Sequence, residues 1–235
     1  MAEANGSVAD GLVGMVNVFV DPQTTAQKVP SPLSWLWPVA VLVIGYGVFG
    51  YLMMPYSMQM VEATMRQQNL PPEQAERAIA MSRTFGMVGA YTLPVILIAF
   101  IALFALLVKV VYSMMDIRPK FRDVFALLAA CSLIPFLQYA AGYFVIHAKG
   151  DPIETAEQLQ PPFGLDVFLQ SIHGVPFAFV HFFSLFQIWY IVVLVFGLAA
   201  LTRSTKMQAF LAATPTWLLP LLMVLIGAMF QKTPS

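Results

Sequence analysis

Residues 84–108 read TFGMVGAYTLPVILIAFIALFALLV and contain no charged side chain. A helix rises about 1.5 Å per residue, so about 20 apolar residues cross the roughly 30 Å hydrocarbon layer of a bilayer. Four other charge-free runs are long enough: 29–61, 124–148, 167–202 and 207–231. In lipid each segment must close its own backbone hydrogen bonds, and the alternating pattern of a membrane barrel is absent. The sequence therefore predicts an all-α, polytopic membrane bundle of five transmembrane helices.

The composition favours the same fold class. The chain has 235 residues with 12 basic and 12 acidic side chains, so 10% is charged while 59% is hydrophobic. Soluble domains are about 25% charged, and so few charges cannot coat a soluble surface of this size. The composition excludes a soluble enzyme, a strongly basic or acidic nucleic-acid binder and a disordered chain. The single cysteine, Cys131, is expected to be a small core residue.

Aromatic residues, prolines and caps place the ends of the spans. Trp35 belongs to an aromatic belt, Pro55 follows the first span, and Pro176 suits the first turn of a helix. Asp123 is either a natural N-cap of the third span or an anion favoured by the helix dipole. Within a membrane domain covering 35–231, the predicted spans are 35–54, 86–112, 123–147, 176–201 and 210–230.

Two segments outside the spans are also predicted to be helical. The amino-terminal arm, 1–34, has apolar residues at helical spacing: Val8, Leu12, Met15, Val16 and Phe19. This amphipathic helix either lies on the inner membrane surface or packs against the cytoplasmic end of the bundle. The first outer loop, 55–85, has Pro71, Pro72 and Glu73 before AERAIAMS, and Arg83 near its end, which indicates a helix aligned with its dipole.

The distribution of basic residues predicts the orientation. Arg118, Lys120 and Arg122 crowd one very short loop, whereas the basic residues on the opposite side are spread over longer loops. The positive-inside rule counts short loops next to the spans, so we expect a cytoplasmic amino terminus and an outside carboxyl terminus. The polar, acidic start of the chain lacks the basic region of a cleavable signal. We expect an integral protein of the bacterial cytoplasmic (inner) membrane.

Few polar groups within the spans are candidates for chemistry. Lys109 is expected to snorkel to the headgroups, His181 to hydrogen-bond a neighbouring helix, and Gln187 to bond across helices. The three histidines have no metal-ligand spacing, and no nucleophile elbow, phosphate loop or carboxylate pair occurs. The sequence therefore predicts no enzyme activity, no cofactor and no metal.

Four stretches together carry a resemblance to a known family. They are VFVDPQTTAQKVP from Val18, PPEQAERAIAMSRTFGMVGAY from Pro71, FRDVFALLAACSLIPFL from Phe121, and FFSLFQIWYIVVLVFGLAALTRSTKMQAF from Phe182. In this order and spacing they resemble the Yip family of Ypt-interacting proteins, in its bacterial form. The resemblance implies five spans with a cytoplasmic amino terminus. Eukaryotic members bind prenylated Rab-type GTPases in vesicle traffic, but the arm here is too short for their cytoplasmic region, so GTPase binding is not carried over.

Two functions are compatible with these features. The first is a non-enzymatic scaffold or adaptor in membrane organisation or trafficking, with membrane lipids and a membrane protein or a second copy of the chain as partners. Its candidate interaction residues are Met15, Val16, Phe19, Arg118, Lys120 and Arg122. The second is a small transporter or an accessory subunit of one, suggested by prolines within the spans, by His181 and Gln187, and by a faint similarity between the segments from Phe121 and Lys206.

Overall fold

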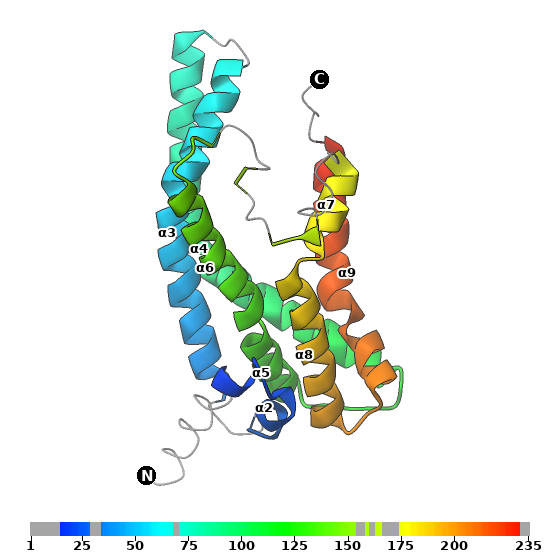
Figure 1. Ribbon diagram of the computed structural model, residues 1–235. Helices are drawn as coiled ribbons and strands as arrows, with labels where there is room; N and C mark the ends of the chain where they lie inside the picture. Colours follow the sequence, from blue (N-terminus) through cyan, green and yellow to red (C-terminus); the bar gives the residue numbers. More distant parts are fainter. Residues whose placement is uncertain are drawn as a thin grey trace, which may run out of the picture. The chain divides into compact units, whose positions relative to one another are not determined.

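The computed structural model describes residues 15–28, 34–67, 71–153, 158–159, 163–165 and 174–230. Helices dominate these residues, and no strand occurs among them (Figure 1). The helices are α2 (Pro22–Lys28), α3 (Leu36–Gln67), α4 (Pro72–Ser113), α5 (Phe121–Cys131), α6 (Leu133–Lys149), α7 (Gly174–Phe182), α8 (Leu185–Thr202) and α9 (Lys206–Phe230).

Five helical segments are long and apolar enough to cross a membrane. They are Leu36–Arg66, Val95–Ser113, Phe121–Lys149, Leu185–Thr202 and Lys206–Met229. The all-α, five-span membrane fold predicted from the sequence is confirmed. Most of the predicted amphipathic helix of the arm lies outside the described residues, which begin at Met15.

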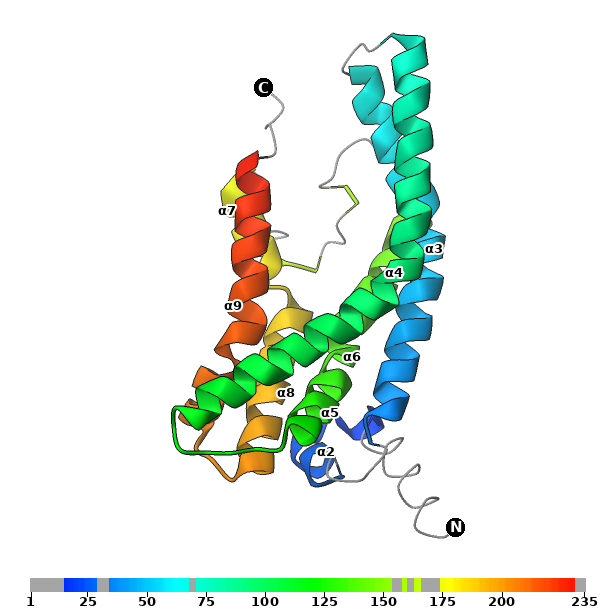
Figure 2. The same cartoon turned by 180° about the vertical axis from the view of Figure 1, so that it is seen from behind.

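The chain divides into two compact units. Unit 1 contains residues 1–42, 98–135 and 163–235. Within it α8 and α9 form a hairpin that both Figures 1 and 2 show, and α2 and α5 pack against α8. Helices α5 and α8 approach closely because position 197 is glycine: a Cβ there would lie 3.0 Å from Cδ1 of Leu127. The core of unit 1 is apolar and includes fully buried Leu127, Leu194 and Leu198.

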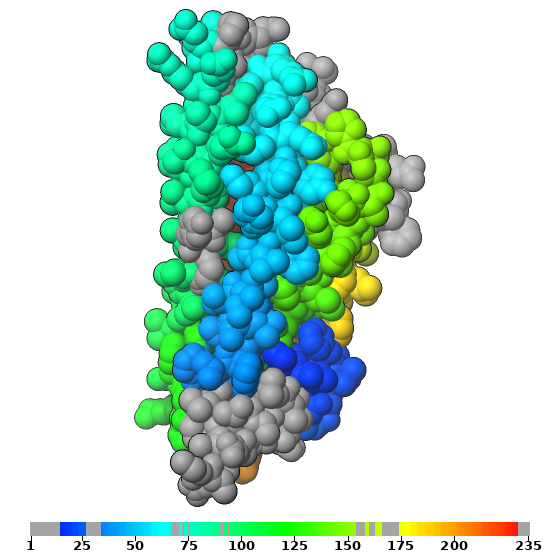
Figure 3. Space-filling model, turned by 90° about the vertical axis from the view of Figure 1, so that its left-hand side faces the viewer, coloured from blue at the N-terminus to red at the C-terminus, as the bar shows by residue number. Residues whose placement is uncertain are grey.

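Unit 2 contains residues 43–97 and 136–162. Its part of α6 packs along one flank of α3, which Figure 3 shows as yellow-green atoms against the cyan ones. Gly45 makes room for the ring of Phe136, which also contacts Tyr46 with ring centroids 5.1 Å apart. Farther along, Met53, Ile146 and Ile153 form a buried cluster.

The sequence predicted that the first span ends before Pro55. Helix α3 instead continues through Pro55 to Gln67. A proline inside a helix removes one backbone donor and costs about 3 kcal/mol. Packing beyond Pro55 offsets this cost, because Tyr56 packs on the Met53 cluster and its hydroxyl lies 2.7 Å from Nδ1 of His147. Residues 55–67 and 72–85 of the predicted first outer loop are thus helical, as parts of α3 and α4.

Two of the predicted spans are interrupted helices. The third is divided between α5 and α6 at Ser132, and Pro135 explains why: it has no N–H for the carbonyl of Cys131, and its ring clashes with that carbonyl. The Ser132 hydroxyl donates to the Leu128 carbonyl at 2.8 Å. The predicted fourth span, 176–201, corresponds to α7 and α8, which are separated at Ser184.

Candidate interaction site

The turn between α4 and α5 is short and held by its own backbone. The amides of Met115 and Ile117 both donate to the carbonyl of Tyr112, at 2.9 and 3.0 Å. Asp116 reverses the chain with φ 60°, the left-handed conformation that aspartate tolerates better than most residues. Residues 114–120, which we call the basic turn, therefore present Arg118 and Lys120 on an ordered backbone.

Tyr112 ties the basic turn to the end of α8. This tyrosine is fully buried, and its hydroxyl lies 3.2 Å from Oγ of Ser204 and 3.3 Å from Oγ1 of Thr202. The Thr202 hydroxyl also lies 2.8 Å from Oγ of Ser204. The buried hydroxyl of Tyr112 needs a partner, and the half-buried hydroxyls of Thr202 and Ser204 supply it. The group holds the ends of α4 and α8 and the α8–α9 turn together.

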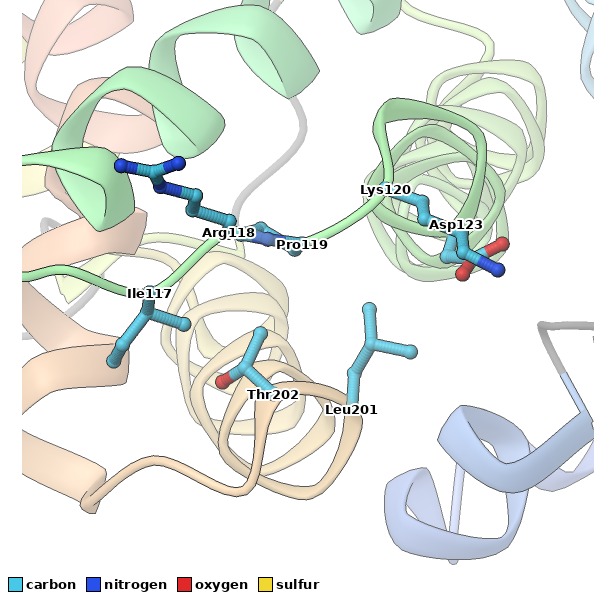
Figure 4. Close-up of a pocket in the computed structure, with 7 residues that line it drawn as sticks. All are labelled: Ile117, Arg118, Pro119, Lys120, Asp123, Leu201 and Thr202. Carbon is cyan, nitrogen blue, oxygen red and sulfur yellow. The ribbon is translucent and has the colours of Figure 1, made fainter.

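A cleft of about 230 Å³ opens between the basic turn and the end of α8. We call it the basic cleft; its lining residues are Ile117, Arg118, Pro119, Lys120, Asp123, Leu201 and Thr202. Figure 4 shows the basic turn on one side and Leu201 and Thr202 on the other. The side chains of Lys120 and Asp123 extend to one side at the start of α5, and Arg118 extends the other way.

Charges of both signs surround the basic cleft. Arg118, Lys120 and Arg122 are exposed, whereas Asp123 is buried. Nε of Arg122 lies 3.3 Å from a carboxylate oxygen of Asp123, whose side chain is 12% exposed. This ion pair neutralises the one carboxylate in the lining, so the other cations determine the sign of the cleft. Of the two roles that the sequence offered for Asp123, the N-cap is wrong, because Lys120 is the N-cap of α5. Asp123 lies in the first turn of α5, where an anion is favoured by the helix dipole.

The candidate residues of the arm divide into two groups. Phe19 packs on Trp189 of α8, with ring centroids 5.7 Å apart, while Val16 is 63% exposed and Met15 is half-buried. Trp189 precedes Thr202 by 13 residues, which is about 20 Å along a helix. The ring contact of the arm therefore lies about 20 Å along α8 from the basic cleft. Of the arm candidates Val16 is the most exposed.

Asp21 caps helix α2. The amide of Thr24 donates to a carboxylate oxygen of Asp21 at 3.1 Å, and the Thr24 hydroxyl donates to the other oxygen. Hydrogen bonds to the charged form favour it, so the Thr24 hydroxyl and then its amide hold the pKa of Asp21 below its ordinary value. The cap and Pro22 at the first helical position explain why α2 begins where it does.

The polar candidates within the spans lie apart from the basic cleft. His181, in the last turn of α7, stacks on Phe177 with ring centroids 5.4 Å apart. The amide of Gln187 donates to the Ser184 hydroxyl at 3.0 Å, which caps α8. Lys109 is half-buried in α4, and its carbonyl accepts from the Ser113 hydroxyl. No group of three His, Cys, Asp or Glu that could hold a metal occurs among the described residues.

Sequence reasoning found the basic turn but missed the groups that position it. Tyr112 and Thr202 are 90 residues apart, and neither belongs to a recognisable motif. A second missed pair lies deeper, where the Tyr190 hydroxyl is hydrogen-bonded to the buried Thr216. The available signal was the clustering of hydroxyl residues Thr202, Ser204 and Thr205 around a very short turn, which indicates local polar bonding.

Comparison with known proteins identifies a family over nearly the whole chain. The Yip1 domain matches residues 16–228. No curated protein and no solved structure matched the chain. The match includes all five membrane-spanning helices, the basic turn and most of the described arm. The chain belongs to the Yip1 domain family.

Proposed function

We propose that this chain is a non-enzymatic scaffold or adaptor that binds another membrane protein, or a second copy of itself, at its cytoplasmic face. The single observation that carries the proposal is the basic turn. Its cations Arg118 and Lys120 are exposed, and the fully buried Tyr112 ties the turn to the end of α8. A preorganised surface loses little entropy on binding, which favours recognition over an incidental surface feature.

The proposed orientation rests on the convergence of two short basic turns. Within unit 1, the basic turn and the end of α8 line one cleft. Arg203 follows directly in the α8–α9 turn, and Lys206 is the first residue of α9. Nζ of Lys206 lies 4.3 Å from the centre of the Phe196 ring, a cation–π contact that keeps its charge near this end. Short basic turns next to spans favour the cytoplasmic side, here of a bacterial inner membrane, with the carboxyl terminus outside.

Site-specific cross-linking combined with mild purification tests the scaffold. A photo-cross-linking residue at Lys120 is expected to give a discrete adduct that mass spectrometry identifies as one membrane protein or a second copy of the chain. Reconstitution with the purified partner should reproduce the adduct. The same probe at Glu73, exposed at the start of α4, is the control and should not give it. A chain that gives no protein adduct from Lys120, Val16 or Arg122 and runs alone would contradict the proposal.

One observation favours the transporter alternative, namely the break between α7 and α8. Interrupted membrane helices often surround transport sites. Here, however, the freed backbone groups have partners within the chain. The Leu185 amide donates to the Phe163 carbonyl at 3.2 Å, and Ser184 accepts from Gln187. A break closed in this way offers fewer free backbone groups to a transported ion, so the scaffold is the better supported function.

Accessibility of the break separates the two functions. A Ser184→Cys variant in a Cys131→Ser background should resist membrane-impermeant thiol reagents if the chain is a scaffold, because Ser184 is buried. Rapid labelling from one side of the membrane, blocked by a small solute, would instead support a transporter. A cysteine at exposed Lys120 is the positive control for labelling.

A further inference from the structure

We propose that the basic cleft binds the phosphate-bearing headgroup of an anionic phospholipid, so that the scaffold selects its own lipid environment. The proposal rests on the cytoplasmic placement argued under the proposed function. It adds anionic phospholipid as the ligand class, and it assigns phosphate binding to Arg118 and Lys120. The ligand is recognised by its phosphodiester charge, and phosphatidylglycerol is the probe used below.

The position of the basic cleft suits a headgroup. Its lining comes from the turn that follows α4, from the first turn of α5 and from the last turn of α8. Each of these helices belongs to a segment long enough to span the hydrocarbon layer. Helix ends of this kind lie at the level of lipid phosphates, where an anionic surface attracts basic side chains.

The polar lining has the chemistry that a phosphate needs. Arg118 offers a planar guanidinium that can bind two phosphate oxygens, and Lys120 offers a compact charge. Lys120 is also the N-cap of α5, and it makes no side-chain capping bond. Arg118 points away from Lys120 in Figure 4, but as an exposed side chain it rotates on a timescale of nanoseconds or faster and can close over a bound phosphate.

The charge balance of the basic cleft favours an anion despite its carboxylate. The lining has two cations, Arg118 and Lys120, and one carboxylate, Asp123, which leaves a formal charge of +1. With Arg122, which lies outside the lining and pairs with Asp123, three cations minus one carboxylate leave +2. The ion pair with Arg122 holds the Asp123 carboxylate in place. The remaining two cations suit one phosphodiester and one neighbouring polar group.

The rest of the lining favours a lipid over an acidic protein segment. Ile117, Pro119 and Leu201 are partly exposed apolar side chains that can contact a glycerol backbone and the first methylenes of an acyl chain. The volume of about 230 Å³ is below the range of roughly 300–1,000 Å³ typical of drug-sized ligands. A phosphodiester with its glycerol fits such a space better than a peptide helix does.

The test measures lipid retention by two matched variants of the full chain. Arg118→Gln/Lys120→Gln removes two exposed charges from the basic cleft, and Arg203→Gln/Lys206→Gln removes two exposed charges next to it. Each chain is reconstituted in phosphatidylcholine nanodiscs with and without phosphatidylglycerol at physiological salt. Native mass spectrometry then counts the retained phosphatidylglycerol. The cleft variant should bind it about tenfold more weakly, and the neighbouring pair should lose less than about threefold.

A rescue variant and two competitors make the result specific. Lys120→Arg keeps the charge and should retain binding, whereas Lys120→Gln alone should lose part of it. Excess inorganic phosphate should displace the lipid poorly, because it lacks the apolar contacts. Complete displacement by equimolar phosphate would mean a free-phosphate site, and displacement by an acidic peptide would mean a protein-binding site; either overturns the lipid assignment.

Failure of this inference is distinguishable from failure of the proposed function. If the two charge variants lose phosphatidylglycerol binding equally, the lipid is attracted by the general surface charge, and the lipid site is overturned. If the Lys120 adduct with a protein partner persists in that case, the scaffold stands without the lipid. If phosphatidylglycerol binds selectively while no protein adduct forms, the lipid site stands and the scaffold falls.

Discussion

The hydroxyl of Tyr112 at the end of α4 lies 3.3 Å from Oγ1 of Thr202 at the end of α8. Both hydroxyls also lie within hydrogen-bond distance of Oγ of Ser204, which belongs to the turn between α8 and α9. The contact joins segments that are distant in the sequence, and it stands directly behind the basic turn. It therefore helps to set the shape of the basic cleft, because Thr202 is part of the lining and Tyr112 supports it from outside the lining.

The Tyr112→Phe variant should be less stable than the parent chain. It removes the buried hydroxyl shared with Thr202 and Ser204, and a net loss of about 1 kcal/mol is expected for one such group. In a chain of this size that lowers Tm by about 2–4 °C, measurable by thermal unfolding in detergent. Tyr51→Phe is the matched control, because Tyr51 is 71% exposed. Equal Tm values for the two variants would show that the hydroxyl group does not hold the helix ends.

Two glycines of α3 should respond in opposite directions to the same substitution. A Cβ at Gly45 would lie 2.6 Å from Cε2 of Phe136, whose ring is itself packed against Tyr46 and Phe49. Gly45→Ala should destabilise the chain by about 1–3 kcal/mol through overpacking. Gly47→Ala meets no atom within 4 Å and should stabilise the helix by about 0.5–1 kcal/mol. Denaturant unfolding measures both, and a shift of the same sign in the two variants would contradict the packing of α6 on α3.

The cap of α2 should titrate according to its hydrogen bonds. The pKa of Asp21 is lowered by Thr24, so the cap contributes fully above the unfolded-state pKa of about 3.9 and is lost as the pH falls through the folded value. Thr24→Val removes the hydroxyl and should move the pKa of Asp21 back toward its ordinary value. Carboxyl-carbon NMR of labelled aspartate follows this directly. Gln23→Ala is the control and should leave the hydroxyl bond intact; an unchanged titration in Thr24→Val would refute the assignment.

Substitutions at two arm residues should have different effects, one on the packing of the arm and the other on partner binding. Phe19→Ala removes the ring contact with Trp189, and such aromatic pairs contribute about 0.5–1.5 kcal/mol beyond their buried area. Backbone hydrogen exchange over residues 15–28 should then become several times faster. Val16→Ser, at a side chain that is 63% exposed, should leave exchange unchanged and weaken only partner cross-linking. Faster exchange in Val16→Ser than in Phe19→Ala would reverse the assignment.

The five spans could be predicted from the sequence because the hydrocarbon layer sets a minimum length for an apolar helix that crosses it. About 20 residues without charge suffice to predict a span, so runs such as 84–108 identify themselves. The basic turn could also be predicted, since Arg118 and Lys120 are separated by one residue along the chain. Local patterns of this kind need no knowledge of tertiary packing.

The interruptions and the anchoring contacts could not be predicted in the same way. Pro55 lies inside a continuous helix, whereas Pro135 follows a break at Ser132, although both are prolines in apolar surroundings. What differs is the packing beyond each residue, which is set by distant segments such as the one carrying His147. The pairing of Tyr112 with Thr202 likewise depends on how the helices assemble.

The acceptor that closes the α7–α8 break has a consequence for biosynthesis. The Phe163 carbonyl bonds the Leu185 amide, and Phe163 is 22 residues nearer the amino terminus. It leaves the ribosome first, so the acceptor is already present when the start of α8 emerges. The interrupted segment can thus be inserted into the membrane together with the preceding segment. The Leu185 amide then has its acceptor when the start of α8 enters the lipid.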